Sequence, residues 1–237
     1  MSRILVTGSE GFIGSKLCKA LEDAGHEVDR LDRRLGMTIA GHRPKPVDCI
    51  IHLAAQIDLQ YSRLHPMQDA LDNIIGTICL IEKYPNTRII YPATAASLPI
   101  TSPYGLSKQT AAEYIKMLCK EYVILTLPNI WGPGGHGAVD KFLKADVIKI
   151  NGDGHQTRTL VHVDDIIKGF VKSLNWPKGE YMLGGPVMSV KEIGEKIAKK
   201  MNKQIRYNLN YDPKKEGEIY ASVIPNTTPD WQPEIEL

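Results

Sequence analysis

The sequence lacks a large charge of either sign, a long apolar run and any pair of closely spaced cysteines. Its 29 Lys and Arg residues nearly balance 27 Asp and Glu residues, and the net charge is +2. This balance gives no electrostatic reason to expect a nucleic acid or an anionic membrane as a partner. No apolar run reaches the roughly 18 residues of a transmembrane helix. No signal peptide is expected either, because Met1 leads directly into a short apolar segment.

The cysteines and histidines exclude further classes of site. The four cysteines, Cys18, Cys49, Cys79 and Cys119, are widely spaced and form no CxxC pair. They are typical of reduced core residues in a cytoplasmic protein. The seven histidines show no metal-ligand spacing, so we predict no metal site. With 237 residues, 43% of them apolar and 24% charged, the chain is similar in composition to globular proteins and can bury a core in one or two domains.

Short apolar segments alternate with helical ones along the first half of the chain. The patterns predict strands at 3–7, 26–32, 48–55, 88–91 and 123–127, and helices at 12–24, 66–84 and 103–122. This alternation predicts an α/β fold, a Rossmann-like doubly wound parallel sheet. After residue 129 the pattern changes, with turns expected at 131–137 and 151–154 and helices near 164–174 and 190–201. We therefore place a domain boundary between residues 128 and 129.

A glycine-rich turn joins the first predicted strand to the first predicted helix. Gly8, Gly11 and Gly14 form a GxxGxxG pattern. Glycines at this spacing allow a tight turn, close approach of a pyrophosphate and packing of the helix on the strand. The N–H groups at the helix N-terminus then face the anion. The turn therefore predicts a dinucleotide-binding site.

The residues at the end of the second predicted strand affect the choice of dinucleotide. Asp32 lies 18 residues after Gly14, where a carboxylate can accept hydrogen bonds from an adenosine ribose. Arg33 and Arg34 follow directly, and an arginine in this region can accommodate the 2′-phosphate of NADP. Because the aspartate is present, we predict NAD as the cofactor, with NADP as the alternative.

Tyr104 and Lys108 lie four residues apart on a predicted helix, so they share one face of it. An ammonium beside a phenol favours the phenolate, and we expect Lys108 to lower the pKa of Tyr104 toward neutrality. Such a tyrosine can act as a general base for an alcohol. Thr94 ends a strand ten residues earlier, at the edge of the sheet where ligands bind, so the three side chains can converge. A second Tyr-x-x-x-Lys pair, Tyr211 and Lys215, lies in a proline-flanked tail, and we assign it no function.

Further motifs follow one another along nearly the whole chain. They are GSEGFIG (8–14), IIHLAAQ (50–56), Asn73 with Gly76-Thr77, Thr94, SPYGLSK (102–108), PNIWGPGG (128–135), GDGHQTRTLVHVDD (152–165) and YMLGG (181–185). With these motifs the chain resembles the extended short-chain dehydrogenases/reductases of the NAD-dependent epimerase/dehydratase family, which act on nucleotide-activated sugars. The resemblance implies a Rossmann domain for NAD(P) at 1–128 and a small substrate-binding region at 129–237, partly interleaved with it. It also implies a homodimer built from the helices near 66–84 and 104–121.

The resemblance also implies roles for individual residues. The residues expected to bind the cofactor are Gly8, Gly11, Phe12, Ile13, Gly14, Asp32, Arg33, Leu53, Ala54, Ala55, Lys108, Pro128 and Ile130. The residues expected to bind the substrate, a nucleoside-diphosphate sugar, are Thr94, Asn129 and Arg158. The expected catalytic residues are Thr94, Tyr104 and Lys108. His52 and His162 are expected to pack at strand ends.

The chain departs from the family pattern in two places. Only fifteen residues separate Asp32 from Asp48, too few for the strand and helix that the family usually has there, so we expect a shortened dinucleotide domain with an open adenine pocket. Ala95 and Ala96 follow Thr94 where dehydratases and decarboxylases need a carboxylate, so we expect neither of these activities. The motifs favour an NAD-dependent sugar-nucleotide epimerase, in which hydride leaves and returns at one sugar carbon. Two alternatives stay open: an NAD(P)H-dependent keto-sugar-nucleotide reductase, and a non-catalytic dinucleotide-binding protein.

Overall fold

A computed structural model describes residues 1–211 and 221–237, and the chain divides into two units. Unit 1 comprises Met1–Thr126 and Ile167–Tyr181, and unit 2 comprises Leu127–Ile166 and Met182–Leu237. The chain therefore leaves unit 1 after Thr126, returns to it at Ile167 and leaves it again after Tyr181. Each unit is described by itself.

Unit 1 is built on a six-stranded sheet. Its strands are β1 (Arg3–Thr7), β2 (Glu27–Leu31), β3 (Cys49–His52), β4 (Arg88–Thr94), β5 (Tyr122–Leu127) and β9 (Gly179–Met182). They lie in the order β2-β1-β3-β4-β5-β9, and the pairs β1–β2, β1–β3 and β3–β4 are parallel. The predicted α/β fold with a Rossmann-like sheet is confirmed.

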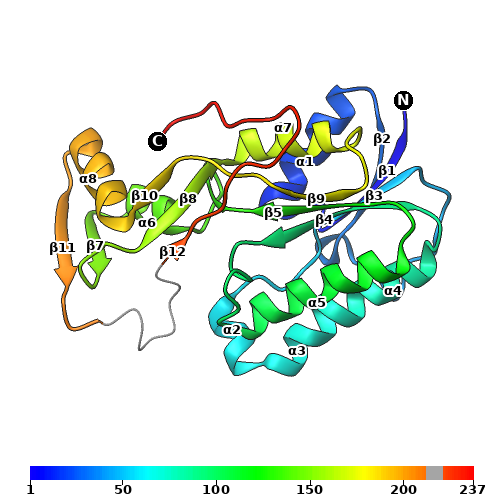
Figure 1. Cartoon of the computed structure of the whole chain (residues 1–237), viewed down its shortest axis with the longest axis horizontal. Helices are drawn as coiled ribbons and strands as arrows, with labels where there is room; N and C mark the ends of the chain where they lie inside the picture. Colours follow the sequence, from blue (N-terminus) through cyan, green and yellow to red (C-terminus); the bar gives the residue numbers. More distant parts are fainter. Residues whose placement is uncertain (212–220) are drawn as a thin grey trace. The chain divides into compact units, whose positions relative to one another are not determined.

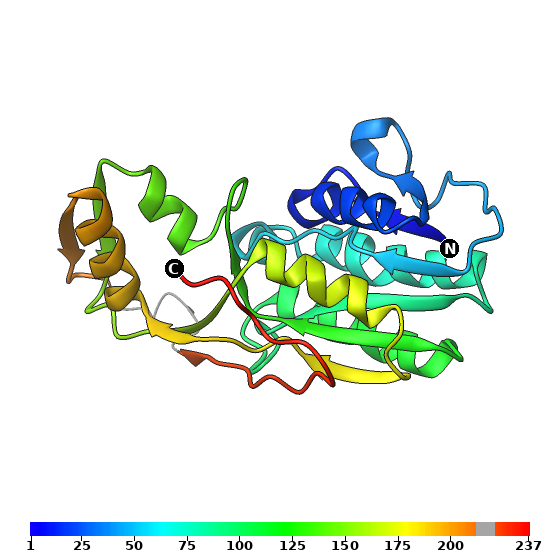
Figure 2. The same cartoon turned by 90° about the horizontal axis from the view of Figure 1, so that it is seen from above.

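Helices cover both faces of this sheet (Figures 1 and 2). One face carries α1 (Phe12–Asp23) and the unit 1 part of α7 (Val163–Ser173). The other face carries the segments α2 (Leu59–Leu64), α3 (Pro66–Ala70), η2 (Leu71–Ile75), α4 (Gly76–Lys83) and α5 (Pro103–Leu118). The helix predicted at 66–84 is present, but its middle turn, η2, is π-helical. The helix predicted at 103–122 ends at Leu118, because Tyr122 already begins strand β5.

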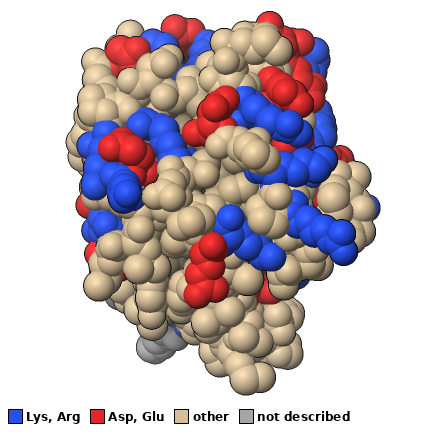
Figure 3. All heavy atoms as spheres, turned by 90° about the vertical axis from the view of Figure 1, so that its right-hand side faces the viewer, with Lys and Arg blue, Asp and Glu red and all other residues tan. Residues whose placement is uncertain are grey.

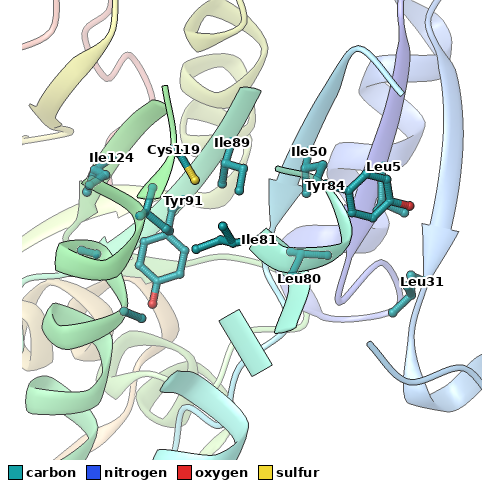
Figure 4. Packing of buried hydrophobic residues seen from close by; sticks show 13 residues of the cluster. Leu5, Leu31, Ile50, Leu80, Ile81, Tyr84, Ile89, Tyr91, Cys119 and Ile124 are labelled. Carbon is teal, nitrogen blue, oxygen red and sulfur yellow. The ribbon is translucent and has the colours of Figure 1, made fainter. Parts of the chain in front are cut away.

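The core of unit 1 lies between the sheet and helices α4 and α5 (Figure 4). The apolar runs of the strands supply Leu5, Ile50, Ile89 and Tyr91, all at most 1% exposed. The two helices contribute every third or fourth residue: Leu80, Ile81 and Tyr84 from α4, and Ala111, Ala112 and Ile115 from α5. This spacing is that of an amphipathic helix, which is why the helices were predictable from the sequence.

The segment between β2 and β3 contains only one short element, η1 (Arg33–Leu35), a 3₁₀ helix. The rest of the segment packs on the core through the partly buried side chains of Met37, Ile39 and Val47. The ring of His42 also hydrogen bonds the Tyr84 hydroxyl at 2.9 Å. An irregular linker therefore covers apolar surface here, and β2 is left as the edge of the sheet.

The surface of unit 1 near this edge carries paired charges. Arg3 pairs with Asp29 at 2.9 Å, and Arg30 of β2 pairs with Glu22 of α1 at 2.9 Å. On the face drawn in Figure 3, basic and acidic side chains are likewise mixed. Charged side chains on an edge strand disfavour pairing with another chain. Within residues 1–211 and 221–237, no helix is long and apolar enough to cross a membrane.

Unit 2 contains short strands around β8 (Thr157–His162). Strand β8 pairs with β6 (Asn129–Trp131), β10 (Val187–Ser189) and β12 (Ala221–Ser222). Strand β7 (Val147–Asn151) pairs with β11 (Gln204–Asn208), and α6 (Ala138–Lys144) and α8 (Val190–Met201) pack on a core that includes Ile148, Ile150 and Ile193. The predicted helices near 164–174 and 190–201 are present as α7 and α8. The strands of unit 2 were not predicted: they lack the continuous apolar runs that mark buried strands such as β1 and β3, and several, such as β10 with three residues, are very short.

Candidate active site

The turn between β1 and α1 is shaped by three glycines. Gly8 has φ +69°, and a Cβ on it would lie 2.7 Å from the backbone nitrogen of Ala54. A Cβ on Gly14 would lie 2.1 Å from the carbonyl oxygen of Gly8. Only glycine fits at both positions, so the turn packs directly against the backbone of Leu53 and Ala54 after β3. The predicted residues Gly8, Gly14, Leu53 and Ala54 are thus brought together, and Ala55 follows them in the chain.

The N-terminus of α1 fits a dinucleotide phosphate. Its N-cap is Gly11, which offers no side chain to the free N–H groups of Phe12 and Ile13, and no acidic residue lies in the first turn. Free N–H groups and the helix dipole favour an anion at this position. The tight glycine turn, together with this uncapped helix end, fits the pyrophosphate of NAD.

Asp32 is engaged with the backbone of the glycine-rich turn. Its carboxylate accepts hydrogen bonds from the N–H groups of Glu10 at 3.0 Å and Arg34 at 2.8 Å. The Arg34 guanidinium in turn donates to the carbonyl oxygen of Glu10 at 2.6 Å. Arg33 forms an ion pair with Asp72 of η2. Asp32 therefore joins the end of β2 to the turn, and both arginines that could attract a 2′-phosphate have partners within the chain.

Thr94 and Tyr104 meet at the end of β4. The Thr94 hydroxyl accepts a hydrogen bond from the Ala96 N–H at 3.1 Å, and it lies close enough to Tyr104 to act on the pKa of the phenol, which it lowers. The start of α5 is fixed by Ser102, whose hydroxyl accepts from the Gly105 N–H at 3.1 Å. A Cβ on Gly105 would lie 2.5 Å from the Ala96 carbonyl oxygen, so glycine lets α5 approach the turn closely enough for this contact.

The structure places Lys108 one turn after Tyr104, but the effect on the tyrosine differs from the prediction. Burial raises the pKa of Tyr104 to about 12, and the hydrogen bond from Thr94 offsets this only in part. The Lys108 ammonium lies over the ring of Tyr91, 4.0 Å from its centroid, and burial lowers its own pKa to about 7. The predicted lowering of the Tyr104 pKa by Lys108 is therefore wrong for this structure: desolvation of the phenolate raises that pKa, the charge of Asp69 adds to the rise, and only Thr94 acts in the opposite direction.

A buried polar bridge stands beside the dinucleotide turn. His52, at the end of β3, hydrogen bonds Thr7 of β1 at 2.7 Å and Thr77 of α4 at 3.0 Å. Thr77 donates in turn to the carbonyl oxygen of Asn73 at 2.6 Å. Burial lowers the pKa of His52 to about 3, so the ring is neutral near pH 7. This residue joins two strand ends to a helix.

Asn73 connects the loop after β3 with helix α5. Its amide donates to the Gln56 carbonyl at 3.0 Å and to the hydroxyl of Ser107 at 3.0 Å, and its oxygen accepts from the Gln56 N–H at 2.8 Å. The same amide reaches the carboxylate of Asp69 at 3.2 Å. Asp69 was not among the predicted site residues. Its position four residues before Asn73, on the same helical face, is the signal that could have pointed to it.

The remaining predicted residues belong to unit 2. Pro128 lies between β5 and β6, and Asn129 and Ile130 lie in β6. Asn129 contacts the hydroxyl of Ser222 at 3.5 Å, and the Arg158 guanidinium, in β8, donates to the Thr157 carbonyl at 2.8 Å. Their roles in binding stay predictions.

The glycine-rich segment after β6 is organised by a residue that the sequence did not suggest. Asp140 of α6, 3% exposed, accepts hydrogen bonds from the N–H groups of Gly132 at 3.1 Å and Gly137 at 3.2 Å. A Cβ on Gly135 would lie 2.3 Å from this carboxylate. The buried Asp140 carboxylate therefore holds both ends of the predicted turn at 131–137. The rings of Trp131 and His162 pack edge to face, with 4.6 Å between the ring centroids.

Comparison with known proteins gives the chain a family. The sequence pattern of the NAD dependent epimerase/dehydratase family matches residues 4–184. A putative UDP-glucose 4-epimerase of Methanocaldococcus jannaschii is 32% identical over 289 aligned positions, which include 99% of this chain and 94% of that protein. A UDP-2-acetamido-2,6-beta-L-arabino-hexul-4-ose reductase of Pseudomonas aeruginosa is 30% identical over 73% of this chain and 50% of that protein.

A solved structure agrees with these matches. The UDP-glucose 4-epimerase of Thermotoga maritima, with UDP-glucose, superimposes with a TM-score of 0.84 at 25% identity, covering 99% of this chain and 94% of that one. The alignment with the Methanocaldococcus protein spans 289 positions, although the whole chain has 237 residues, so this chain lacks segments that its relative has. The predicted resemblance is confirmed: the chain belongs to the NAD-dependent epimerase/dehydratase family of extended short-chain dehydrogenases/reductases.

Proposed function

We propose that this protein is an NAD-dependent sugar-nucleotide epimerase, which removes and returns hydride at one carbon of a nucleoside-diphosphate sugar. The observation that carries the proposal is the placement of Tyr104, at the start of α5, beside Thr94 at the carboxyl end of β4, with Lys108 one helical turn further along α5. Ligands of parallel α/β sheets bind at this edge. The names of the relatives, a putative UDP-glucose 4-epimerase among them, support a sugar nucleotide as substrate.

The cofactor is proposed to bind along unit 1. Gly8, Gly11 and Gly14 cradle its pyrophosphate with the N–H groups of Phe12 and Ile13, and Asp32 and Arg33 lie by the adenosine ribose. Leu53, Ala54 and Ala55 line the adenosine half, and Lys108 holds the nicotinamide ribose. The family resemblance also assigns Pro128 and Ile130, which belong to unit 2, to the nicotinamide half. NAD held there would supply the acceptor for a hydride from the sugar carbon, to which the hydride would return. The fit of this group rests on the uncapped α1 terminus and on the close glycine packing.

The protein's own residues manage the proton. Tyr104 takes the proton from the sugar hydroxyl and later returns it, while the Thr94 hydroxyl holds the same oxygen. Since burial keeps Tyr104 protonated at neutral pH, a positive charge is needed to favour its phenolate. The ammonium of Lys108, on the same face of α5, is the group of this chain that can provide it.

The sugar nucleotide is proposed to contact Asn129 and Arg158 of unit 2, in addition to Thr94. An arginine can pair with a diphosphate through two parallel hydrogen bonds, and an asparagine amide can both donate to and accept from a sugar. These two residues therefore supply chemistry suited to the nucleotide end of the substrate, as the family resemblance implies.

A reductase is the second candidate, because one relative is named as a reductase of a UDP-linked keto sugar. It would use Thr94, Tyr104 and Lys108 once rather than twice. A dinucleotide-binding protein without turnover is the third candidate. The burial of Tyr104 and Lys108 argues against this third candidate, because burial disfavours the charged form of both side chains. Such an arrangement destabilises the fold, and a protein that only binds a dinucleotide gains nothing from it.

The test is incubation of the purified protein with NAD and a panel of UDP-sugars, followed by NMR of the sugar ring. An epimerase changes the ring couplings and leaves the mass unchanged. A reductase leaves the panel unaltered but oxidises NADH or NADPH when a keto-sugar nucleotide is supplied. Mass spectrometry of the denatured protein adds a second readout, since an epimerase recycles NAD in place and is expected to release it only on unfolding.

We also propose that two chains associate through helices α3, η2, α4 and α5, which pack beside one another in unit 1 (Figure 1). Their outer side carries apolar residues in contact with water: Met67 is 75% exposed, Ile75 52%, Met117 81% and Leu118 50%. An apolar surface on neighbouring helices is typical of a protein–protein interface.

The four cysteines are free thiols, which supports a reducing compartment such as the cytoplasm.

A further inference from the structure

Asp69 of α3 is a carboxylate enclosed by protein. It is 1% exposed, and its Oδ1 accepts hydrogen bonds from the Gln56 amide at 2.7 Å and the Asn73 amide at 3.2 Å. Among the described residues its Oδ2 has no hydrogen-bond partner, although the atom is shielded from solvent. A buried carboxylate in this condition is costly unless a positive charge lies nearby.

Lys108 of α5 is the buried positive charge on the neighbouring helix. It is 3% exposed, and α5 packs against α3. The Asn73 amide bridges the two helices, because it contacts both Asp69 and the hydroxyl of Ser107, the residue next to Lys108. The charge of Asp69 raises the pKa of Lys108, against the larger effect of burial, and it also raises that of Tyr104.

Among the described residues beside this pair, two titratable groups are neutral near pH 7 and two charged groups have other partners. His52 on β3 is neutral near pH 7, since burial lowers its pKa to about 3. Burial holds the pKa of Tyr91 on β4 well above its ordinary value, so its ring faces the ammonium as a neutral surface. On η2, Asp72 is paired with Arg33. On α2, Arg63 donates to the backbone of the loop before α5 rather than to Asp69.

We propose that Asp69 is a positioning residue for the catalytic pair: its buried carboxylate, held by Gln56 and Asn73, keeps Lys108 charged beneath Tyr104. This inference rests on the proposed function, because the buried Lys108 needs to be charged only if its ammonium favours the phenolate of a catalytic Tyr104. It assigns to the polar network of Gln56, Asp69 and Asn73 a part in the chemistry, in addition to joining the loop after β3 to α5.

Loss of the Asp69 charge should shift the acid and the alkaline limb of the pH profile in the same direction. This holds whether Tyr104 or Lys108 controls a given limb. A negative charge favours the protonated form of both a phenol and an amine. If Asp69 loses its charge, the pKa values of Tyr104 and Lys108 must therefore move in the same direction, downward. The whole curve of turnover against pH then shifts to lower pH. A change in its width or its height alone is not expected.

The test is Asp69→Asn, which keeps the oxygen that Gln56 and Asn73 contact and removes the charge. We expect the pH profile of kcat to move down by about 0.5–1.5 pH units, as for a unit charge nearby at an effective dielectric of about 20. The Lys108 pKa, followed by NMR of ¹³C-labelled lysine with Lys108→Met for assignment, is expected to fall by a similar amount. Glu82→Gln, which removes an exposed acid from α4, is the matched control and should shift neither. An unchanged Lys108 pKa in a folded Asp69→Asn protein would overturn the proposal.

Failure of the proposed function gives a different result from failure of this inference. If the unmodified protein epimerises no sugar nucleotide but Asp69→Asn lowers the Lys108 pKa, the charge relation stands and the assigned reaction is wrong. If Asp69→Asn does not fold, the double variant Asp69→Asn/Lys108→Met follows, which leaves no buried ammonium without a partner. We expect the double variant to fold. A double variant that also fails to fold shows that Asp69 is needed for the network independently of Lys108, and this overturns the proposal.

Discussion

Tyr104 and Lys108 are both held in surroundings that disfavour their charged forms. The pKa of the tyrosine is raised to about 12, and that of the lysine is lowered to about 7. A tyrosine and a lysine on an exposed helix would show neither shift, since both shifts arise from burial. Shifts of this kind cluster at functional sites, and here they occur where the sequence predicts the catalytic residues.

Removal of the Tyr104 hydroxyl should stop the chemistry without unfolding the protein. We expect Tyr104→Phe to lower kcat by about 10²–10⁴, the usual effect of losing a general acid–base group. The apolar ring remains, so the melting temperature should change little. The control is Tyr211→Phe, at the other Tyr-x-x-x-Lys pair, whose Lys215 lies outside the described residues. Equal losses in the two variants would remove Tyr104 from the mechanism.

Lys108 should lower the stability of the protein while serving its function. Its pKa falls from an ordinary value of 10.5 to about 7 on folding, so between these values the unfolded chain binds more protons and stability rises with pH. Below pH 7 the destabilisation is present in full. The double variant Asp69→Asn/Lys108→Met, which leaves neither buried charge without a partner, should therefore raise the melting temperature at pH 6 by roughly 5–10 °C, with the gain fading toward pH 10.5, while turnover is lost.

Thermal unfolding followed by circular dichroism across this pH range measures the effect. Lys116→Met is the control on the same helix, because Glu113 and Glu180 raise the pKa of Lys116 instead of lowering it, and it should give no gain. An Asp69→Asn/Lys108→Met protein that is less stable than the unmodified one at every pH would contradict the interpretation.

At the scale of the elements, the β1–α1 corner depends on glycines for steric reasons. A methyl group at Gly14 would lie 2.1 Å from the Gly8 carbonyl oxygen, so Gly14→Ala must push α1 away from β1. We expect a loss of about 2 kcal/mol or more of unfolding free energy and at least tenfold weaker NAD binding. Gly76→Ala is the matched control: Gly76 has helical φ of −57°, and its nearest neighbour to a Cβ is 3.7 Å away.

Gly76→Ala should instead stabilise the protein by about 0.5–1 kcal/mol, because alanine has the higher helix propensity. Urea unfolding and calorimetry with NAD measure both variants. If Gly14→Ala and Gly76→Ala changed the unfolding free energy and NAD binding equally, the β1–α1 corner would tolerate a side chain. Its close packing would then not shape the cofactor site.

The end of β4 limits the reactions that this chain can catalyse. Thr94 is followed by Ala95 and Ala96, and elimination or decarboxylation at the sugar requires an additional acid or base beside the reacting carbons. Methyl groups cannot transfer protons. We therefore expect no product that has lost water or carbon dioxide when the protein is incubated with NAD and UDP-, dTDP-, GDP- or CDP-sugars. Mass spectrometry of the products checks this, and a dehydrated or decarboxylated sugar nucleotide would refute it.

At the scale of the whole molecule, the apolar side of α3, η2, α4 and α5 should determine the oligomeric state. Light scattering on the unmodified protein is expected to give about twice the chain mass of 26.4 kDa. Met117→Glu places a charge on the most exposed residue of this surface and should yield monomers, because a desolvated carboxylate without a partner opposes association.

The control for the dimer is Leu209→Glu, which changes an apolar residue that is 76% exposed but lies in unit 2. It should leave the mass unchanged. A monomer in the unmodified protein, or a dimer that persists in Met117→Glu, would place the interface elsewhere or exclude it.

The sequence by itself determined the features that depend on neighbours along the chain. The glycine-rich turn, the alternation of strands and helices, α8 at Val190–Met201 and the Tyr104–Lys108 spacing are all local patterns with a fixed period, and the motifs in their order identified the family. The tertiary structure decided what depends on partners distant in sequence. It partly buried Tyr104, so its pKa rises instead of falling, and it brought Gln56, from the loop after β3, to Asp69 and Asn73 beside α5. Burial is the physical reason for both differences, because desolvation and buried charge arise only when segments far apart in the chain pack together.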